Sequence, residues 1–160
     1  LPLARQIAEA LDYAHSQGVV HQDLKPSNIV VAAGLAKVMD FGIARRAQDT
    51  LSTMTRGEAV GTPAYMAPEQ EQGIVTPKAD LYSFGVCLYQ LLSGHAPFGR
   101  GDNIFSKAEK RFLPLSRQAN LPAAVDSVID TALDPDPAKR PVSALAIVTS
   151  LEQALARPTA

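Results

Sequence analysis

The sequence predicts one domain of the α+β class, predominantly α-helical, with short β-strands beside its polar loops. Three observations support this class. The chain has 160 residues and is 46% hydrophobic, which is enough for one buried core. Several segments carry apolar residues at helical spacing, and shorter apolar runs between polar and glycine turns favour strands.

The first helix is expected over Pro2 to Gln17, with proline at its start and Gly18 at its end. The most hydrophobic helix is expected over Ala79 to Ser93. It has little polar face, so it should lie at the centre of the domain. Further helices are expected over Ala123 to Leu133, over Val142 to Ala156 and, shorter, near Asn103 to Arg111.

Short strands are expected at Val19-Val20, Ile29 to Val31 and Lys37 to Met39. They bracket a polar cluster from His21 to Asn28. The segment from Ala44 to Thr62 has no apolar period, so it predicts a long surface loop, and such loops often carry function.

The amino-acid composition indicates which classes of binding partner are not favoured. The 15 basic and 16 acidic residues balance, so neither nucleic acid nor an anionic membrane surface is favoured as a partner. The single cysteine, Cys87, cannot form an internal disulfide. These 160 residues show neither a charged-then-apolar leader pattern nor the run of about 18 apolar residues that a membrane segment needs. A cytoplasmic setting is therefore expected.

The polar residues with the clearest chemistry lie on two turns. Asp23, Lys25 and Asn28 fall within His21-Gln22-Asp23-Leu24-Lys25-Pro26-Ser27-Asn28, and Asp40 opens the triplet Asp40-Phe41-Gly42. Carboxylate and amide oxygens suit Mg²⁺, and phosphoryl transfer needs a cation near the phosphate and a carboxylate near the attacking hydroxyl. The pattern therefore indicates phosphoryl transfer.

These motifs resemble those of protein kinases of the serine/threonine type, in particular the eukaryotic-like kinases of bacteria. The first segment is similar to the catalytic loop H-R-D-L-x-x-x-N, and the triplet to the metal-binding D-F-G. Ala67-Pro68-Glu69, Asp80 to Gly85 and Arg140-Pro141 follow in the family's order. The resemblance implies a C-terminal kinase lobe over residues 1–156, followed by a tail at 157–160.

The resemblance also implies the roles of the site residues. Asp23 would be the catalytic aspartate, and Lys25 would lie near the transferring phosphate, as in kinases that act on serine and threonine. The Thr62 hydroxyl would bond to both of them. Asn28 and Asp40 would hold Mg²⁺, with Gly42 permitting the turn after Asp40. The implied cofactors are ATP and Mg²⁺, and the implied partner is a protein substrate.

Other positions acquire a scaffold role from the same resemblance. Val30 would form the floor under the adenine ring, with Cys87 and Leu91 beneath it. Cys87 is therefore expected to be an unreactive core residue. The remaining implied contacts are an ion pair between Glu69 and Arg140, a packed pair of His21 with Phe41, and an anchor from Asp80 to the His21 backbone.

Two departures from the family pattern matter. The glycine-rich loop and strand lysine that cover ATP precede the catalytic loop, yet only 20 residues precede His21. The chain is therefore expected to be part of a longer protein, for which membrane anchoring stays open. By itself it should bind ATP weakly and transfer phosphate slowly or not at all. Its uncovered cleft face should favour self-association.

Gln22 is the second departure, because it replaces an arginine that binds a phosphorylated activation loop in many kinases. Activity without loop phosphorylation is therefore expected, although Arg45 and Arg46 could partly compensate. The candidate phosphorylation sites are Thr50, Ser52, Thr53 and Thr55.

An alternative function stays open, in which the chain is a non-catalytic kinase-like module that binds or regulates a partner.

Some polar residues receive no role under either function. His15 and His95 have no partner at metal-ligand spacing. Glu9, Asp12 and Glu71 are expected to be solvated.

Overall fold

The computed structural model describes residues 1–41, 62–98 and 104–157. Most of the long loop expected from Ala44 to Thr62 lies outside these residues, and so does Gly42. The same holds for the two arginines and the candidate phosphorylation sites of that loop, which are Arg45, Arg46, Thr50, Ser52, Thr53 and Thr55.

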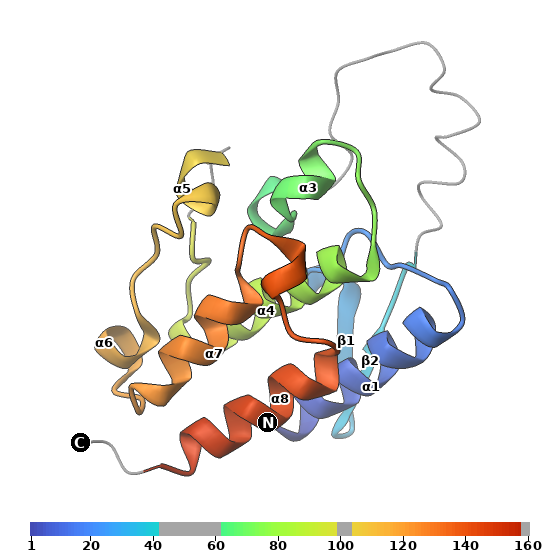
Figure 1. Ribbon diagram of the computed structural model, residues 1–160. Coiled ribbons are helices and arrows are strands. Elements are labelled where there is room, and N and C mark those ends of the chain that lie inside the picture. The colour runs from blue at the N-terminus through green and yellow to red at the C-terminus, as the bar shows by residue number, and fades with distance from the viewer. Residues whose placement is uncertain (42–61, 99–103, 158–160) are drawn as a thin grey trace.

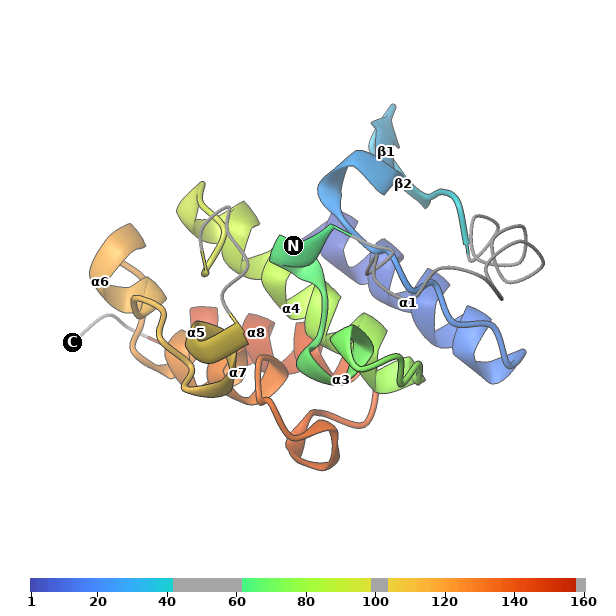
Figure 2. The same ribbon diagram turned by 90° about the horizontal axis from the view of Figure 1, so that it is seen from above.

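Helices make up most of the structure, and a two-stranded sheet lies at its edge (Figures 1 and 2). The helices are α1 (Pro2–Ser16), α3 (Pro68–Glu71), α4 (Pro77–Ser93), α5 (Ile104–Ala108), α6 (Leu115–Ala119), α7 (Ala124–Ala132) and α8 (Ala144–Leu155). Three 3₁₀ turns are η1 (Pro26–Asn28), η2 (Pro63–Tyr65) and η3 (Pro137–Lys139). The strands are β1 (Ile29–Ala32) and β2 (Leu35–Val38).

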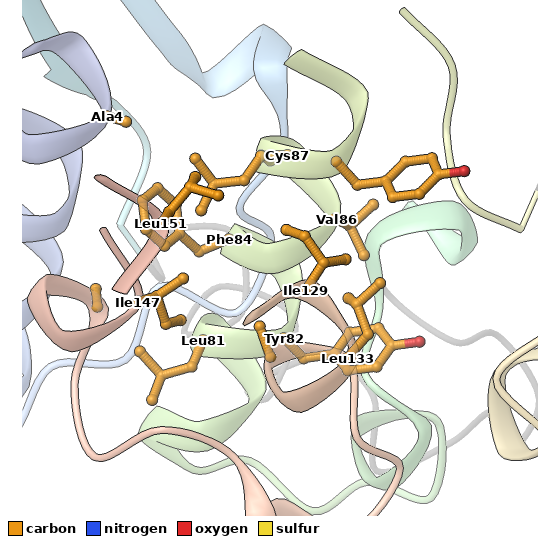
Figure 3. Close-up of a cluster of buried hydrophobic side chains, with 14 of the residues drawn as sticks. Ala4, Leu81, Tyr82, Phe84, Val86, Cys87, Ile129, Leu133, Ile147 and Leu151 are labelled. Atoms are coloured by element: carbon orange, nitrogen blue, oxygen red, sulfur yellow. The ribbon is translucent and has the colours of Figure 1, made fainter. Parts of the chain in front are cut away.

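Helix α4 forms the centre of the core, as its apolar composition predicts. Every residue from Ala79 to Tyr89 is buried, and side chains from α1, α7 and α8 surround it (Figure 3). At Gly85 an added Cβ would lie 3.0 Å from the Ala132 Cβ, so α4 and α7 approach closely there only because a side chain is lacking. Gly94, in the left-handed conformation, ends the helix.

The sheet is an antiparallel hairpin in which Ile29 pairs with Val38 and Val30 with Lys37. It packs against α1. The Gln6 side chain joins the two elements, because its oxygen accepts from the Ala36 amide at 2.7 Å and its nitrogen donates to the Gly34 carbonyl at 3.2 Å. The hairpin is therefore fixed to the helical body, with its two ends beside the polar loops.

The predicted fold class and the main helices are confirmed, with bounds shifted by one to three residues. The predicted strand at Val19-Val20 is wrong. The Val19 amide donates to the Ala14 carbonyl at 2.9 Å and closes the end of α1 instead. The short helices α3 and α6 carry too little apolar pattern to be predicted. No helix in the described ranges has the length and apolar character needed to cross a bilayer.

Asp12 contradicts the expectation that it is solvated. Its carboxylate accepts hydrogen bonds from the first amides of α8, at 2.8 Å from Ala144 and 3.0 Å from Leu145. It acts as an N-cap supplied by a different helix, so it ties α1 to α8. Glu9, one turn earlier, is exposed as expected.

Replacing Asp12 by alanine should lower the free energy of unfolding by about 1–2 kcal/mol, because two helix amides lose their acceptor. Urea denaturation monitored by circular dichroism measures the change. Glu9→Ala, an exposed carboxylate on the same helix, is the matched control and should change stability by less than about 0.5 kcal/mol. Equal effects of the two variants would contradict the capping role.

Candidate active site

Asp80, a buried residue in the first turn of α4, anchors the backbone of the loop from His21 to Asn28. This loop is the segment that resembles a kinase catalytic loop, and it keeps that name below. One oxygen, Oδ2, accepts from the His21 amide at 2.7 Å, and Oδ1 accepts from the Gln22 amide at 2.8 Å. The predicted anchor is therefore confirmed and extends to a second amide. Gln22 has a φ of 73°, a conformation that is costly for a non-glycine residue and needs such support.

The expectation that His15 has no role is wrong. Its Nε2 lies 2.8 Å from the Asp80 Oδ2. Ile7, Leu11 and His15 are spaced by four residues, so they share one face of α1, and the first two are buried. That spacing was the signal in the sequence that His15 faces the core side of the helix.

Four predicted site residues meet in one cluster. The Lys25 ammonium lies 2.7 Å from the Asp23 carboxylate and donates to the Thr62 hydroxyl at 2.9 Å. The Thr62 amide, not its hydroxyl, approaches Asp23 at 3.3 Å. The Asn28 side-chain amide donates to the Asp23 carbonyl at 2.8 Å. The Asp23 side chain remains 39% exposed, so its carboxylate is accessible to a substrate.

The second half of the site lies at the open end of the hairpin. The Met39 amide donates to the Asn28 carbonyl at 2.8 Å, which continues the pairing beyond Ile29 and Val38 and puts Asp40 next to Asn28. Asp40 is exposed and has a φ of 60°. Because the nitrogen of the Asn28 amide faces the Asp23 carbonyl, its oxygen is available to a cation.

This donor set fits Mg²⁺. Magnesium in phosphoryl-transfer sites takes one or two protein oxygens and completes its shell with phosphate oxygens and water. The described residues contain no cluster of three histidine, cysteine, aspartate or glutamate side chains that would form a complete protein cage. Asn28 and Asp40 supply an amide oxygen and a carboxylate on neighbouring backbone, the pattern expected for a shared site.

His21 and Phe41 connect the two halves. The His21 Nε2 donates to the Met39 carbonyl at 2.8 Å, and the two rings pack with centroids 4.8 Å apart. The predicted packed pair is present. Because His21 also precedes Asp23 in the catalytic loop, it links the position of that loop to the turn that carries Asp40.

Val30 lies on the outer side of the hairpin, where it is 48% exposed. Successive strand residues point to opposite faces. Ile29 and Val31 accordingly line an apolar hollow of about 310 Å³ on the other side, together with Cys87 and Leu91 from α4. These two α4 residues thus lie beneath the strand of Val30, as predicted. Self-association through the uncovered cleft face stays a prediction.

Cys87 is a core residue. Its side chain is buried in α4, and burial raises the pKa of its thiol to about 12. The thiolate is the reactive form of cysteine, and it is scarce at neutral pH when the pKa is this high. The structure therefore supports the expectation that Cys87 is unreactive.

The predicted ion pair between Glu69 and Arg140 is present and bidentate. The guanidinium nitrogens donate to the two carboxylate oxygens at 2.6 and 2.7 Å. The Arg140 side chain is fully buried and lies over the Tyr82 ring at 4.9 Å. It also donates to backbone carbonyls, including that of Asp134 at 2.7 Å. The ion pair joins α3, which follows the η2 turn, to the segment between η3 and α8.

Lys107 is a functional neighbour that the sequence did not reveal. This buried residue of α5 donates to the carbonyls of Pro63 and Met66 at 2.6 and 2.9 Å, and to the Glu71 carboxylate at 2.6 Å. It therefore holds both ends of the turn that follows Thr62. The expectation that Glu71 is solvated is wrong, because it neutralises this lysine.

With this geometry established, comparison with known proteins identifies the class. Residues 2–155 match the protein kinase domain family, so the chain belongs to that family. It is 39% identical over 153 residues to a probable serine/threonine-protein kinase PknB of Bifidobacterium longum. It is 44% identical over 151 residues to the serine/threonine-protein kinase PknJ of Mycobacterium bovis. The predicted resemblance to bacterial serine/threonine kinases is confirmed.

The aligned regions cover 91% and 87% of this chain but 22% and 26% of those two proteins. Among solved structures, the PknI kinase domain of Mycobacterium tuberculosis superimposes with a TM-score of 0.74 at 29% identity, covering 94% of this chain and 53% of that one. Rad53 in complex with AMP-PNP gives a TM-score of 0.73 at 28% identity, covering 93% and 38%. The fold is that of the C-terminal lobe of a protein kinase, and the chain spans about half of the PknI domain.

Breaking the buried ion pair from one side should be costly. Arg140→Met should lower the free energy of unfolding by about 3–5 kcal/mol, because Glu69 keeps a buried charge without a partner. Thermal and urea denaturation measure the loss. Arg111→Met removes an exposed arginine paired with Glu109 and should cost less than about 1 kcal/mol. If Arg140→Met were as mild as this control, the proposed importance of the pair would be wrong.

Proposed function

We propose that this chain is the substrate-binding and metal-binding half of a protein serine/threonine kinase, which transfers the γ-phosphate of ATP to serine and threonine hydroxyls of proteins. One observation carries the proposal. Asp23 contacts both Lys25 and Thr62, and Asn28 joins this cluster to the hairpin end that carries Asp40. The names of the relatives support the same activity.

Asp23 is proposed to orient the substrate hydroxyl and to accept its proton as the oxygen attacks phosphorus. The carboxylate is partly exposed and therefore accessible, and the Lys25 ammonium lies 2.7 Å from it. The Lys25 ammonium, held by the Thr62 hydroxyl at 2.9 Å, is proposed to stabilise negative charge on the transferring phosphoryl oxygens.

Asn28 and Asp40 would hold Mg²⁺ through their side-chain oxygens. The bound ion would neutralise charge on the ATP phosphates. The exposed side chain of Val30 would contact the adenine ring from the side of this lobe. The chain is therefore proposed to contribute two things to nucleotide binding, namely the surface below the adenine ring and the protein ligands of the metal.

Because the chain spans about half of a solved kinase domain, we propose that the nucleotide-covering half is supplied by a further part of the protein. Positioning of both reactants provides most of the rate in this chemistry. The 160-residue chain alone is therefore expected to bind ATP weakly and to transfer phosphate slowly or not at all.

The regulation of the kinase and its location in the cell are also proposals. Gln22 offers no charge to a phosphorylated loop, so activity is expected without loop phosphorylation. The single buried cysteine and the absence of a spanning helix in the described ranges are compatible with the cytoplasm.

The test compares magnesium-ATP binding, by calorimetry, and phosphoryl transfer in the 160-residue chain and in the full-length protein that carries it. The full-length protein should bind ATP and transfer phosphate to serine or threonine. Asp40→Ala should abolish both, because the metal loses its carboxylate. Asp23→Asn should keep ATP binding but reduce transfer by about 10²–10⁴-fold, because it cannot accept the proton.

Asp130→Ala, an exposed carboxylate on α7, is the matched control and should leave both measurements unchanged. Absence of nucleotide binding in the full-length protein would contradict the kinase proposal. It would favour the alternative of a non-catalytic module that binds or regulates a partner protein.

A further inference from the structure

Helix α3 is held in place by two buried cations from other parts of the fold. The Glu69 carboxylate pairs with Arg140, and the Glu71 carboxylate pairs with Lys107. Both cations are buried. Gln70 lies between these two carboxylates in the sequence, and its own exposed fraction is 5%. The short helix that carries Gln70 is therefore fixed by the residues on either side of it.

The Gln70 side chain contacts the backbone of the catalytic loop. Its Nε2 donates a hydrogen bond to the Gln22 carbonyl, which belongs to the peptide group that joins Gln22 to Asp23. The N–H of the same peptide group lies 3.3 Å from the Nδ1 of His21. That Nδ1 is the acceptor, because the Nε2 of His21 donates to the Met39 carbonyl. Side chains therefore hold both polar ends of this peptide group.

Asp80 acts on the two peptide groups that precede this one. Its carboxylate accepts from the His21 and Gln22 amides at 2.7 and 2.8 Å. Gln22 has a φ of 73°, which is unfavourable for a residue with a side chain, so its backbone needs support on both sides. Asp80 supports the preceding side and Gln70 the following side. A rotation of the peptide group after Gln22 would turn the Asp23 backbone and move its carboxylate.

The position of this carboxylate matters because Asp23 is proposed to orient the substrate hydroxyl and to accept its proton. Positioning provides much of the rate of phosphoryl transfer, and a small displacement of a reacting group lowers that rate strongly. The Lys25 ammonium and the Thr62 amide approach the carboxylate at 2.7 and 3.3 Å. These two contacts hold the end of the Asp23 side chain, whereas Gln70 holds the backbone from which it extends.

We propose that Gln70 is a positioning residue for phosphoryl transfer, which fixes the peptide group between Gln22 and Asp23 and thereby directs the Asp23 carboxylate. Gln70 acts through Asp23 and is not itself a catalytic residue. Because Glu69 and Glu71 fix the helix that carries Gln70, a displacement of α3 would reach Asp23 through the same contact. This inference rests on the proposed function, since its effect is on transfer to a serine or threonine hydroxyl.

Single-turnover phosphoryl transfer by the full-length protein tests this role, with labelled ATP and with casein as the acceptor. Gln70→Met has a similar length but no donor, and Gln70→Asn places its amide one methylene short of the Gln22 carbonyl. Each variant should lower the transfer rate at saturating ATP by about tenfold or more. The ATP concentration that gives half of the maximal rate should change by less than about threefold, because the proposed metal ligands are untouched.

The two variants differ in polarity and size, so one of them keeps the test valid if the other folds poorly. Gln72→Met is the matched control. Gln72 is an exposed glutamine at the C-terminal end of α3. Its replacement should leave both the transfer rate and the ATP dependence unchanged.

A double-mutant cycle with Asp23→Asn separates positioning from a general structural role. In the Asp23→Asn background the carboxylate that Gln70 directs is already lost. Gln70→Met should therefore lower the remaining transfer by less than about twofold. A loss of folded protein would instead lower transfer by the same factor in both backgrounds.

The outcomes separate this inference from the proposed kinase activity. Unchanged transfer in Gln70→Met and Gln70→Asn would overturn the positioning role and leave the kinase proposal standing. Equal losses with and without the Asp23 carboxylate would do the same. Absence of transfer by the unaltered full-length protein would contradict the kinase proposal, and this inference with it.

Discussion

The arrangement of the site depends on one buried carboxylate. Asp80 belongs to the most deeply buried helix, yet its two oxygens accept from the His21 and Gln22 amides of an irregular loop. His15 contacts the same carboxylate from α1. A loop without regular hydrogen bonding needs such external acceptors, because buried amides without partners are unfavourable. The core helix thereby determines where the catalytic loop lies.

Further polar side chains around the site also hold its segments to other parts of the fold. Lys25 connects the catalytic loop to the Thr62 turn, and Lys107 holds the two ends of that turn. The Glu69–Arg140 pair fixes the helix that follows it. Each contact joins segments far apart in the sequence. Arg140 and Lys107 are buried, so removing the carboxylate that pairs with either of them would leave a buried charge without compensation. The proposed chemistry thus depends on polar groups whose positions are set by the fold, not by local structure.

The sequence predicted the fold class and the long helices because their apolar periods are set locally, as at Ala79 to Ser93. It also predicted the main site contacts, through motif order. It did not predict Lys107, because nothing local shows that this lysine is buried against another segment. Asp12 and Glu71 were missed for the same reason, since their partners lie far along the chain. The partners of Thr62 were named from the family motif, but only the structure shows that its amide, and not its hydroxyl, approaches Asp23.

The role of Asp80 is tested most directly by amide hydrogen exchange in Asp80→Asn. This isosteric change removes the charge and should speed exchange at His21 and Gln22 by roughly tenfold to hundredfold, equivalent to about 1–3 kcal/mol, while core amides such as Leu151 stay protected. Asp126→Asn alters a carboxylate that accepts from the Ser116 amide at 2.9 Å away from the site. It should leave His21 and Gln22 unaffected. Unchanged exchange at both amides in Asp80→Asn would contradict the account.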